Sequence, residues 1–154
     1  MAIRTIRTQE DPILRKTSRR VEVFDDRLCT LLDDMAETMY KAEGVGLAAV
    51  QVGVLRRVVV INTGEGLIEL VNPEITETQG EQRVSEGCLS LPGQSGVTKR
   101  PATVKVKAQN RNGNWCLYKG EDLKARAFCH EIDHLDGILY IDRLAANETV
   151  ELDK

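Results

Sequence analysis

The pentapeptide HEIDH at positions 130–134 constrains the fold of this chain more than any other feature, and it contains both of the chain's histidines. Residues four apart lie on one face of an α-helix, so both imidazoles can reach one metal ion. The same face continues through Leu123 and Ala127, which indicates that it points inward. Two core histidines without a metal are the competing interpretation, but the paired spacing, with Glu131 after the first histidine, favours metal binding.

A catalytic metal site of this type uses three protein ligands and leaves one position open. The chain has no third histidine, so the third ligand must be a carboxylate or a cysteine. Cys129 would point about 100° away from its histidine neighbour around the helix. Cys29 and Cys116 fall in an expected helix and an expected strand. Cys88, in the sequence EGCLSLP, is the best candidate, and a thiolate with two imidazoles suits zinc or ferrous iron.

Hydrophobic periodicity predicts two helices with strands between them. Apolar residues at three- and four-residue spacing indicate a helix over about 25–42, capped by Asp25 and stopped by Gly44. A second helix is expected from residue 121 or 122 to about Leu135, with Gly137 just past its end.

Strands are expected between the helices, and turn residues separate them. They cover residues 58–61, 67–71, 75–84, 103–108 and 115–118. Asn72-Pro73 is expected to end the second strand, and Gly80 to form a bulge or turn in the third. Asn112-Gly113 is expected to join the last two strands as a hairpin. This order predicts an α+β fold of mostly antiparallel β-sheets packed around a central HExxH helix, with one N-terminal helix. We expect residues 1–154 to form a single metallohydrolase domain.

The segment GVGLAAVQVG at 44–53 is rich in small residues. Its glycines fit a dinucleotide-binding pattern, but that pattern follows a strand and opens a helix, whereas here a helix precedes it. One interpretation is a turn that allows tight packing. In the other, Gly44 and Gly46 expose backbone to an extended ligand and Gln51 supplies an amide donor.

Composition excludes several classes of function. The net charge is −3, from 21 Lys and Arg against 24 Asp and Glu, which is too small to indicate direct nucleic-acid or membrane binding. The start of the chain mixes charged and apolar residues without the apolar core of a signal peptide, so we expect a cytoplasmic protein with reduced cysteines.

The segments GVGLAAVQVG, EGCLS and HEIDH resemble those of peptide deformylases in order and spacing, and the opening DPILRK also resembles that family's start. The resemblance covers essentially the whole chain. It implies a hydrolase that removes the formyl group from the N-terminal formylmethionine of nascent polypeptides and releases formate. It also implies that Cys88, His130 and His134 hold one divalent metal ion, Fe²⁺ in the cell, with Zn²⁺, Ni²⁺ or Co²⁺ able to replace it.

The resemblance assigns roles to further residues. It makes Glu131 the catalytic acid and base, and it makes the Gln51 amide and the backbone N–H of Leu89 the donors to the reacting oxygen. Six positions are expected around the substrate: Val45, Gly46, Val84, Glu86, Leu123 and Ala127. Arg126 stands at the rim of this pocket where the family often has an aliphatic residue, and Arg100 is expected to pair with Glu86.

Two positions depart from the family pattern, and other functions remain open. Cys129 replaces the usual glutamine before the HExxH motif. The chain ends at Lys154, earlier than we expect for the further C-terminal helix of many bacterial members, so the expected association with the ribosome is in question.

The expected partners are N-formylmethionyl peptides and nascent chains, with the protein itself a monomer. The alternatives are a general zinc metallopeptidase, or a structural-metal protein without catalysis in which Cys29 or Cys116 is the fourth ligand.

Overall fold

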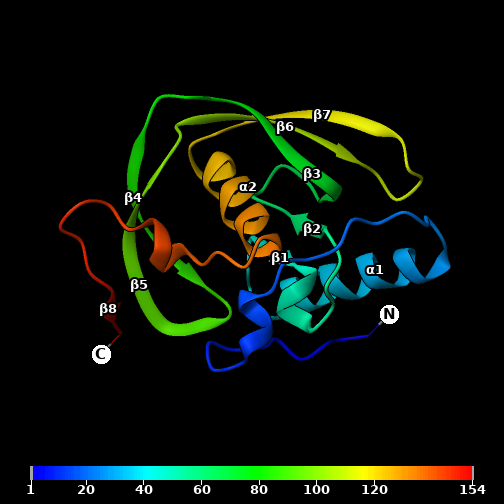
Figure 1. Cartoon of the computed structure of the whole chain (residues 1–154), viewed down its shortest axis with the longest axis horizontal. Coiled ribbons are helices and arrows are strands. Elements are labelled where there is room, and N and C mark those ends of the chain that lie inside the picture. Colours follow the sequence, from blue (N-terminus) through cyan, green and yellow to red (C-terminus); the bar gives the residue numbers. More distant parts are fainter. Residues whose placement is uncertain (1, 154) are drawn as a thin grey trace.

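The computed structural model describes residues 2–153, which form two α-helices and eight strands (Figure 1). The helices are α1 (Asp26–Lys41) and α2 (Asp122–Leu135), and the strands are β1 (Gly46–Ala48), β2 (Val58–Ile61), β3 (Ile68–Gln79), β4 (Gln82–Cys88), β5 (Leu91–Arg100), β6 (Thr103–Gln109), β7 (Trp115–Glu121) and β8 (Glu151–Leu152). Three short 3₁₀ helices are η1 (Pro12–Arg15), η2 (Ala49–Val52) and η3 (Tyr140–Arg143). None of the helices in this part of the chain is long and apolar enough to cross a lipid bilayer.

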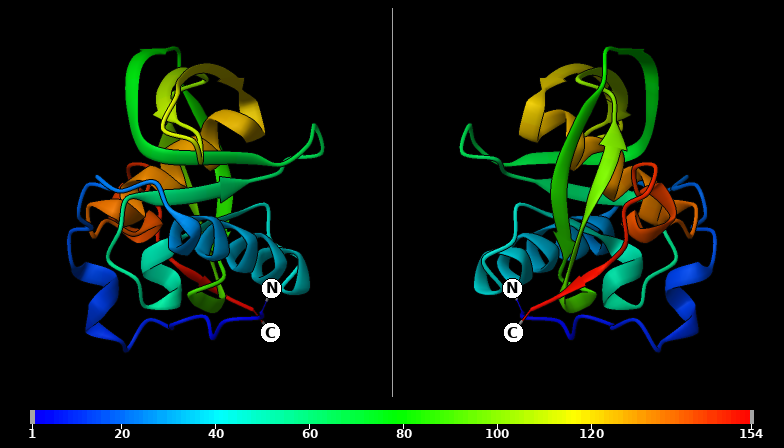
Figure 2. Two further views of the ribbon diagram at one scale, coloured as in Figure 1. Left: turned by 90° about the vertical axis from the view of Figure 1, so that its right-hand side faces the viewer. Right: turned by 90° about the vertical axis from the view of Figure 1, so that its left-hand side faces the viewer.

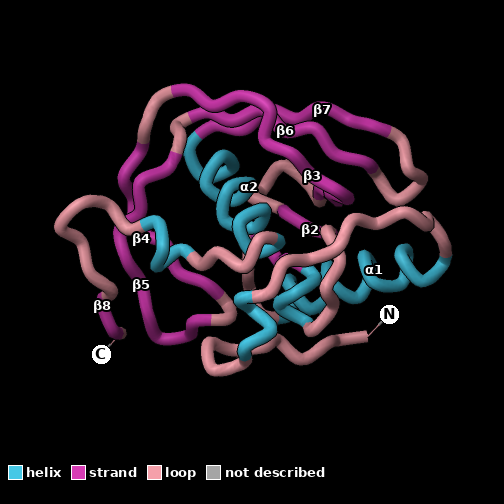
Figure 3. Tube along the Cα trace, viewed as in Figure 1, coloured by secondary structure: helices cyan, strands magenta, loops and turns pink. Residues whose placement is uncertain are grey.

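The strands form two antiparallel sheets, which confirms the predicted α+β class with mostly antiparallel pairing (Figure 3). The larger sheet has the order β1-β2-β3-β6-β7 and the smaller one the order β4-β5-β8. Helix α2 packs on the larger sheet and also contacts β5 of the smaller one. In Figure 1, β6 and β7 lie on one side of α2 and β4 and β5 on another.

Helix α1 begins where the sequence predicts and ends within one residue of its predicted end. The carboxylate of Asp25 accepts a backbone N–H of the first turn at 3.1 Å, as expected of an N-cap residue. At the other end Glu43 adopts the left-handed conformation, with φ 58°. The Gly44 N–H donates to the Met39 carbonyl at 2.9 Å, which closes the last turn.

Strand β2 is buried on both faces because a helix covers each side of the sheet. Val59 and Ile61 join the core cluster of α2, whereas Val58 and Val60 join that of α1. Side chains on a strand alternate between its two faces, so one run of four apolar residues serves two cores. Each such side chain contributes about 1.5–3 kcal/mol on full burial. Figure 2 shows α1 running along one side of this sheet.

One predicted strand break is wrong, and one predicted turn is confirmed. Strand β3 continues through Asn72-Pro73 instead of ending there, because a register shift between Val71 and Glu74 accommodates the two residues. The side chain of Asn72, whose φ is 51°, pairs with both the N–H and the carbonyl of Val21. The predicted turn at Gly80 is confirmed: its φ is 69° and β4 begins two residues later.

The smaller sheet was not predicted from the sequence, and it carries Cys88. This cysteine is the last residue of β4, after an irregularity in the pairing between Glu86 and Cys88. Strand β4 pairs only with β5 among the described residues, so its other edge is free. Strand β1 is likewise an edge strand of the larger sheet.

Candidate active site

The three predicted ligands meet where the end of β4 faces α2. The Cys88 Sγ lies 3.4 Å from the His134 Nε2, and one ligand atom from each of Cys88, His130 and His134 lies within 4.8 Å of the others. The two imidazoles come from successive turns of α2 and lie edge to face, with ring centroids 5.0 Å apart. Both histidines are buried, while Cys88 is partly exposed to the pocket described below.

This donor set suits a divalent metal ion. The Nδ1 of His130 pairs with the Glu86 carboxylate at 2.9 Å, which leaves Nε2 of the ring as its ligand atom. Burial lowers the pKa of His134 well below its ordinary value, so this ring stays neutral and keeps a lone pair for a metal. Two neutral imidazoles and a thiolate are the ligands expected for zinc or ferrous iron. Among the described residues, Cys29, Cys116 and Cys129 are not part of the cluster, so a closed four-ligand structural site is not formed.

Glu86 is held by a network of charges on three elements. Arg100 of β5 donates to both of its carboxylate oxygens, at 2.9 and 3.1 Å, and the hydroxyl of Thr98 also pairs with it. Arg100 in turn contacts Asp133 of α2 at 2.7 Å. Burial alone would raise the pKa of Glu86, but the hydrogen bonds to His130 and Arg100 outweigh it and lower the pKa to about 2. Glu86 therefore remains an anion that orients the His130 ring.

Glu131 follows the first ligand and faces the pocket from α2. Its Oε2 lies 4.0 Å from the His130 Nε2, and its Oε1 has no hydrogen-bond partner within residues 2–153. A Cβ atom at Gly46 would lie 2.6 Å from Oε2, so only glycine leaves room for this carboxylate. Burial raises the pKa of Glu131 to about 7. A carboxyl group with this environment can both accept and return a proton near neutral pH.

Gln51 reaches the same place from η2, in the small-residue segment. Its Oε1 accepts the Ala48 N–H at 2.9 Å. Its Nε2 lies 3.0 Å from the Ser90 Oγ and 3.7 Å from the Cys88 Sγ. The segment is no dinucleotide-binding turn, since it follows helix α1 and leads into strand β1, and it brings a buried amide beside the predicted metal ligand.

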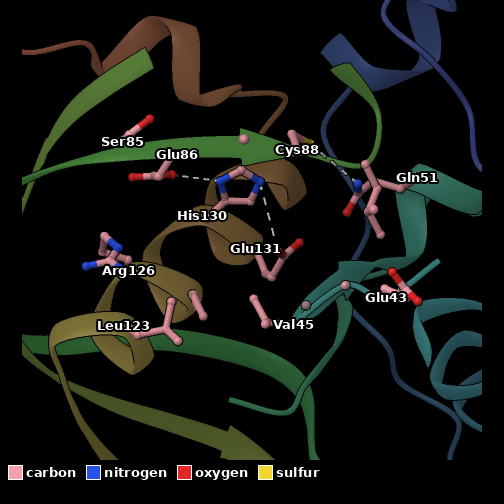
Figure 4. A pocket seen from close by; sticks show the side chains of 15 residues that line it. Glu43, Val45, Gln51, Ser85, Glu86, Cys88, Leu123, Arg126, His130 and Glu131 are labelled. Atoms are coloured by element: carbon pink, nitrogen blue, oxygen red, sulfur yellow. Dashed lines mark hydrogen bonds and ion pairs between the residues drawn. The ribbon is translucent and has the colours of Figure 1, made fainter. Parts of the chain in front are cut away.

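These groups line a pocket of about 380 Å³ between β4, α2 and the segment before β1 (Figure 4). Its walls are Glu43, Gly44, Val45, Gly46 and Gln51 from one side, Ser85, Glu86, Gly87, Cys88 and Leu89 from another, and Leu123, Arg126, Ala127, His130 and Glu131 from α2. Figure 4 shows Leu123 and Arg126 on the side of the pocket away from Gln51 and Cys88. One end is thus partly apolar and the other carries the reactive groups.

Most of the predicted site residues lie in this lining. Val84 and His134 are the two exceptions: Val84 is 38% exposed on β4, next to the lining. His134 lies behind the pocket wall, against Cys88. Ser90 and Asp133 were not predicted as site residues: they contact Gln51 and Arg100 but belong to no catalytic sequence pattern of their own. Cys129 is buried, and burial raises the pKa of its thiol to about 11.

Known proteins match this chain in both sequence and structure. The family model described as Polypeptide deformylase matches residues 3–150. The chain is 61% identical over 144 residues to the peptide deformylase of Alkaliphilus metalliredigens, covering 94% of this chain and 98% of that protein. It resembles the crystal structure of peptide deformylase from Thermotoga maritima with 42% identity and a TM-score of 0.91, covering 93% of this chain and 98% of the other. A peptide deformylase from Synechococcus elongatus, solved in complex with actinonin, is 37% identical with a TM-score of 0.88, covering 92% and 79%.

Proposed function

This chain belongs to the polypeptide deformylase family and removes the N-terminal formyl group from nascent peptides, and we propose that it does so in the pocket between β4 and α2. The cluster of Cys88, His130 and His134 carries this proposal, because its ligand atoms converge beside Glu131. A general metallopeptidase shares the HExxH helix, but the family match extends over residues 3–150 and not over the helix alone.

The family uses one metal ion, and in this chain Cys88, His130 and His134 would hold it. We propose Fe²⁺ as the ion in the cell, with Zn²⁺, Ni²⁺ or Co²⁺ as functional replacements, since one thiolate and two imidazoles accept all four. Bound there, a divalent ion would supply Lewis acidity that activates water and polarises the formyl oxygen.

Glu131 moves the proton in this proposal. Its carboxylate has an oxygen without a hydrogen-bond partner among residues 2–153, lies in the pocket wall and is adjacent in sequence to a proposed metal ligand. It takes a proton from the attacking water and returns it to the amine nitrogen as the C–N bond of the formamide breaks. The products are formate and a peptide with a free amino terminus.

Gln51 and Leu89 stabilise the formyl oxygen as it gains negative charge. Both line the pocket beside Cys88, and the Gln51 amide is already oriented by its hydrogen bonds. Donors fixed in advance cost no reorganisation during the reaction, and removal of one such donor typically lowers the rate by ~10²–10³. The Leu89 backbone N–H, in the turn after β4, is the second donor.

The substrate lies in this pocket as an extended peptide. The free edges of β1 and β4 both border the pocket, through Gly46 and Gly87, and strand edges bind extended peptides through backbone hydrogen bonds. Val45, Leu123 and Ala127 surround the methionine side chain, with Val84 beside them and Arg126 at the rim.

We further propose that the protein is a cytoplasmic monomer of one domain, acting on chains as they leave the ribosome. The supporting observation for one domain is that α2 contacts strands of both sheets, so the described residues pack as one unit. Sedimentation of the purified protein with and without ribosomes measures both its oligomeric state and the association.

A formate assay tests the proposed activity. The protein is purified anaerobically, its metal content is measured, and it is given a formyl-Met tripeptide and, separately, an internally cleavable peptide without a formyl group. We expect formate release from the first and no cleavage of the second, together with inhibition by actinonin, the compound bound to the Synechococcus elongatus relative. Cleavage of internal peptide bonds without formate release would overturn the proposal.

A further inference from the structure

We propose that Ser90 is a positioning residue for the reaction, because its buried hydroxyl holds the Gln51 amide so that one N–H group points into the pocket. The inference rests on the proposed function, in which Gln51 donates to the reacting oxygen. Ser90 itself is fully buried and is not part of the pocket lining, so it acts through Gln51.

The hydrogen bonds determine which way round the amide lies. The backbone N–H of Ala48 can only donate, so the side-chain atom of Gln51 that lies 2.9 Å from it is the oxygen. The nitrogen is therefore at the opposite corner of the amide group. There it donates to the Ser90 Oγ at 3.0 Å and lies 3.7 Å from the Cys88 Sγ.

The two N–H groups of the amide then have different surroundings. One is directed at Ser90, behind the pocket wall. The other is directed towards Cys88, which lines the pocket together with Gln51. Because an amide is planar, contacts that fix its oxygen and one N–H also fix the direction of the second N–H. Ser90 thereby fixes the direction of the Gln51 N–H group that donates to the reacting oxygen.

Ser90 also lies close in sequence to a proposed metal ligand. Ser90 lies in the turn between β4 and β5, two residues after Cys88. One short turn therefore carries a proposed metal ligand, the proposed donor Leu89 and the hydroxyl that orients Gln51. Donors aimed before the reaction begins stabilise charge more than mobile donors do.

The first test compares Ser90→Ala with Ser18→Ala. Ser18 is also buried, but its hydroxyl has no hydrogen-bond partner within residues 2–153, so it controls for loss of a buried serine hydroxyl. We expect Ser90→Ala to lower kcat about tenfold, less than the ~10²–10³ expected for removal of the donor itself. Its KM and metal content should stay unchanged, Ser18→Ala should match the wild type, and Ser90→Thr, which retains a hydroxyl, should recover most of the rate.

A double-mutant cycle separates positioning from a general structural effect. In a Gln51→Ala background, Ser90→Ala should lower kcat by less than about twofold, because the group that it orients is already absent. An equal loss in both backgrounds would overturn the proposal, and so would a wild-type kcat in Ser90→Ala. If the wild type and Ser18→Ala release no formate, the proposed function fails instead.

An NMR measurement tests the contact without turnover. In protein labelled with ¹⁵N-glutamine, the side-chain amide protons of Gln51 should exchange with solvent more slowly than those of the exposed Gln79, and Ser90→Ala should speed the exchange at Gln51. Exchange at Gln51 as fast as at Gln79 in the wild type would contradict the proposal even if Ser90→Ala did not fold.

Discussion

Glu131 combines burial with an incomplete set of hydrogen bonds. It is 4% exposed, and its Oε1 has no hydrogen-bond partner within residues 2–153. The carboxylate fits only because Gly46 has no side chain. A buried carboxylate oxygen without a partner costs free energy, commonly about 1–3 kcal/mol or more. Such a group is retained where the reaction uses it, because the substrate or water supplies the missing partner.

Replacing Glu131 should therefore separate activity from stability. We expect Glu131→Ala to retain bound metal but to lose ~10²–10⁴ in kcat, the range for general acid–base catalysis. Its free energy of unfolding should fall by no more than about 1 kcal/mol, because the lost side chain leaves behind no unpaired group. Steady-state formate release and urea unfolding measure the two quantities. A variant that keeps more than about a tenth of the wild-type kcat would rule out Glu131 as the proton carrier.

The cysteines differ in their relation to the metal. Cys88 belongs to the three-residue cluster, whereas Cys116 lies on β7 and is partly exposed to a similar degree. We expect Cys88→Ala to weaken metal binding by more than the ~10–100-fold that loss of an outer partner costs, and Cys116→Ala to leave it unchanged. Metal analysis after dialysis measures this difference. Full metal content in the Cys88 variant would contradict the assigned ligand set.

At the scale of elements, strand β3 depends on Asn72. Its buried side chain accepts the Val21 N–H at 2.8 Å and donates to the carbonyl of Val21 at 2.9 Å and to Gln109 at 2.8 Å. Asparagine also tolerates the left-handed φ that this position requires better than most residues do. These contacts attach the segment before α1 to the middle of the larger sheet.

Asn72→Ala should consequently be strongly destabilising. It removes three hydrogen bonds, leaves buried backbone groups unpaired and puts alanine, which tolerates a left-handed φ less well than asparagine, at this position, so we expect a loss of about 2–4 kcal/mol. Asn114→Ala, at an exposed position, is the matched control and should stay within about 0.5 kcal/mol of the wild type. Urea unfolding of both variants measures the difference, and equal stabilities would show that the Asn72 contacts contribute little.

The same elements explain what could be predicted from the sequence. Both helices follow from local periodicity and capping residues such as Asp25, and the two histidines of the candidate metal site follow from the HExxH spacing. Strand β5 could not be predicted in this way, because its sequence LPGQSGVTKR contains glycine and proline and lacks alternation; pairing with β4 and β8 makes it a strand. The orientation of Gln51 depends on Ser90, 39 positions away in the sequence. Contacts of that kind arise only once the chain has folded.

At the scale of the whole molecule, three separate segments build the pocket. Residues 43–51, 85–89 and 123–131 supply its lining, and each belongs to a different layer: the edge of the larger sheet, the smaller sheet and α2. The two helices cover opposite faces of β2, which keeps the edge strand β1 in place against α2. The site therefore requires the complete fold, and partial unfolding of any one layer should abolish metal binding and activity together.

Asp34 provides a pH-dependent part of this stability. Its carboxylate, on the buried side of α1, accepts the Ala2 N–H at 2.7 Å and pairs with Arg4 at 2.9 Å, so it attaches the start of the chain to the helix. Burial alone would raise the pKa of Asp34, but the hydrogen bonds from Ala2 and Arg4 outweigh it and lower the pKa below the ordinary value.

The direction of that pKa shift predicts how stability depends on pH. A carboxyl group with a lowered pKa in the folded state contributes stability above its unfolded pKa of about 3.9, and loses that contribution as the pH falls through its folded value. We expect Asp34→Asn to be less stable than the wild type at pH 7, and the difference to shrink as the pH falls below about 4. Denaturant unfolding across that range measures it, with Glu22→Gln, which removes an exposed carboxylate, as the control. A difference that is constant with pH would mean that the charge of Asp34 contributes nothing, and that its contacts act only as uncharged hydrogen bonds.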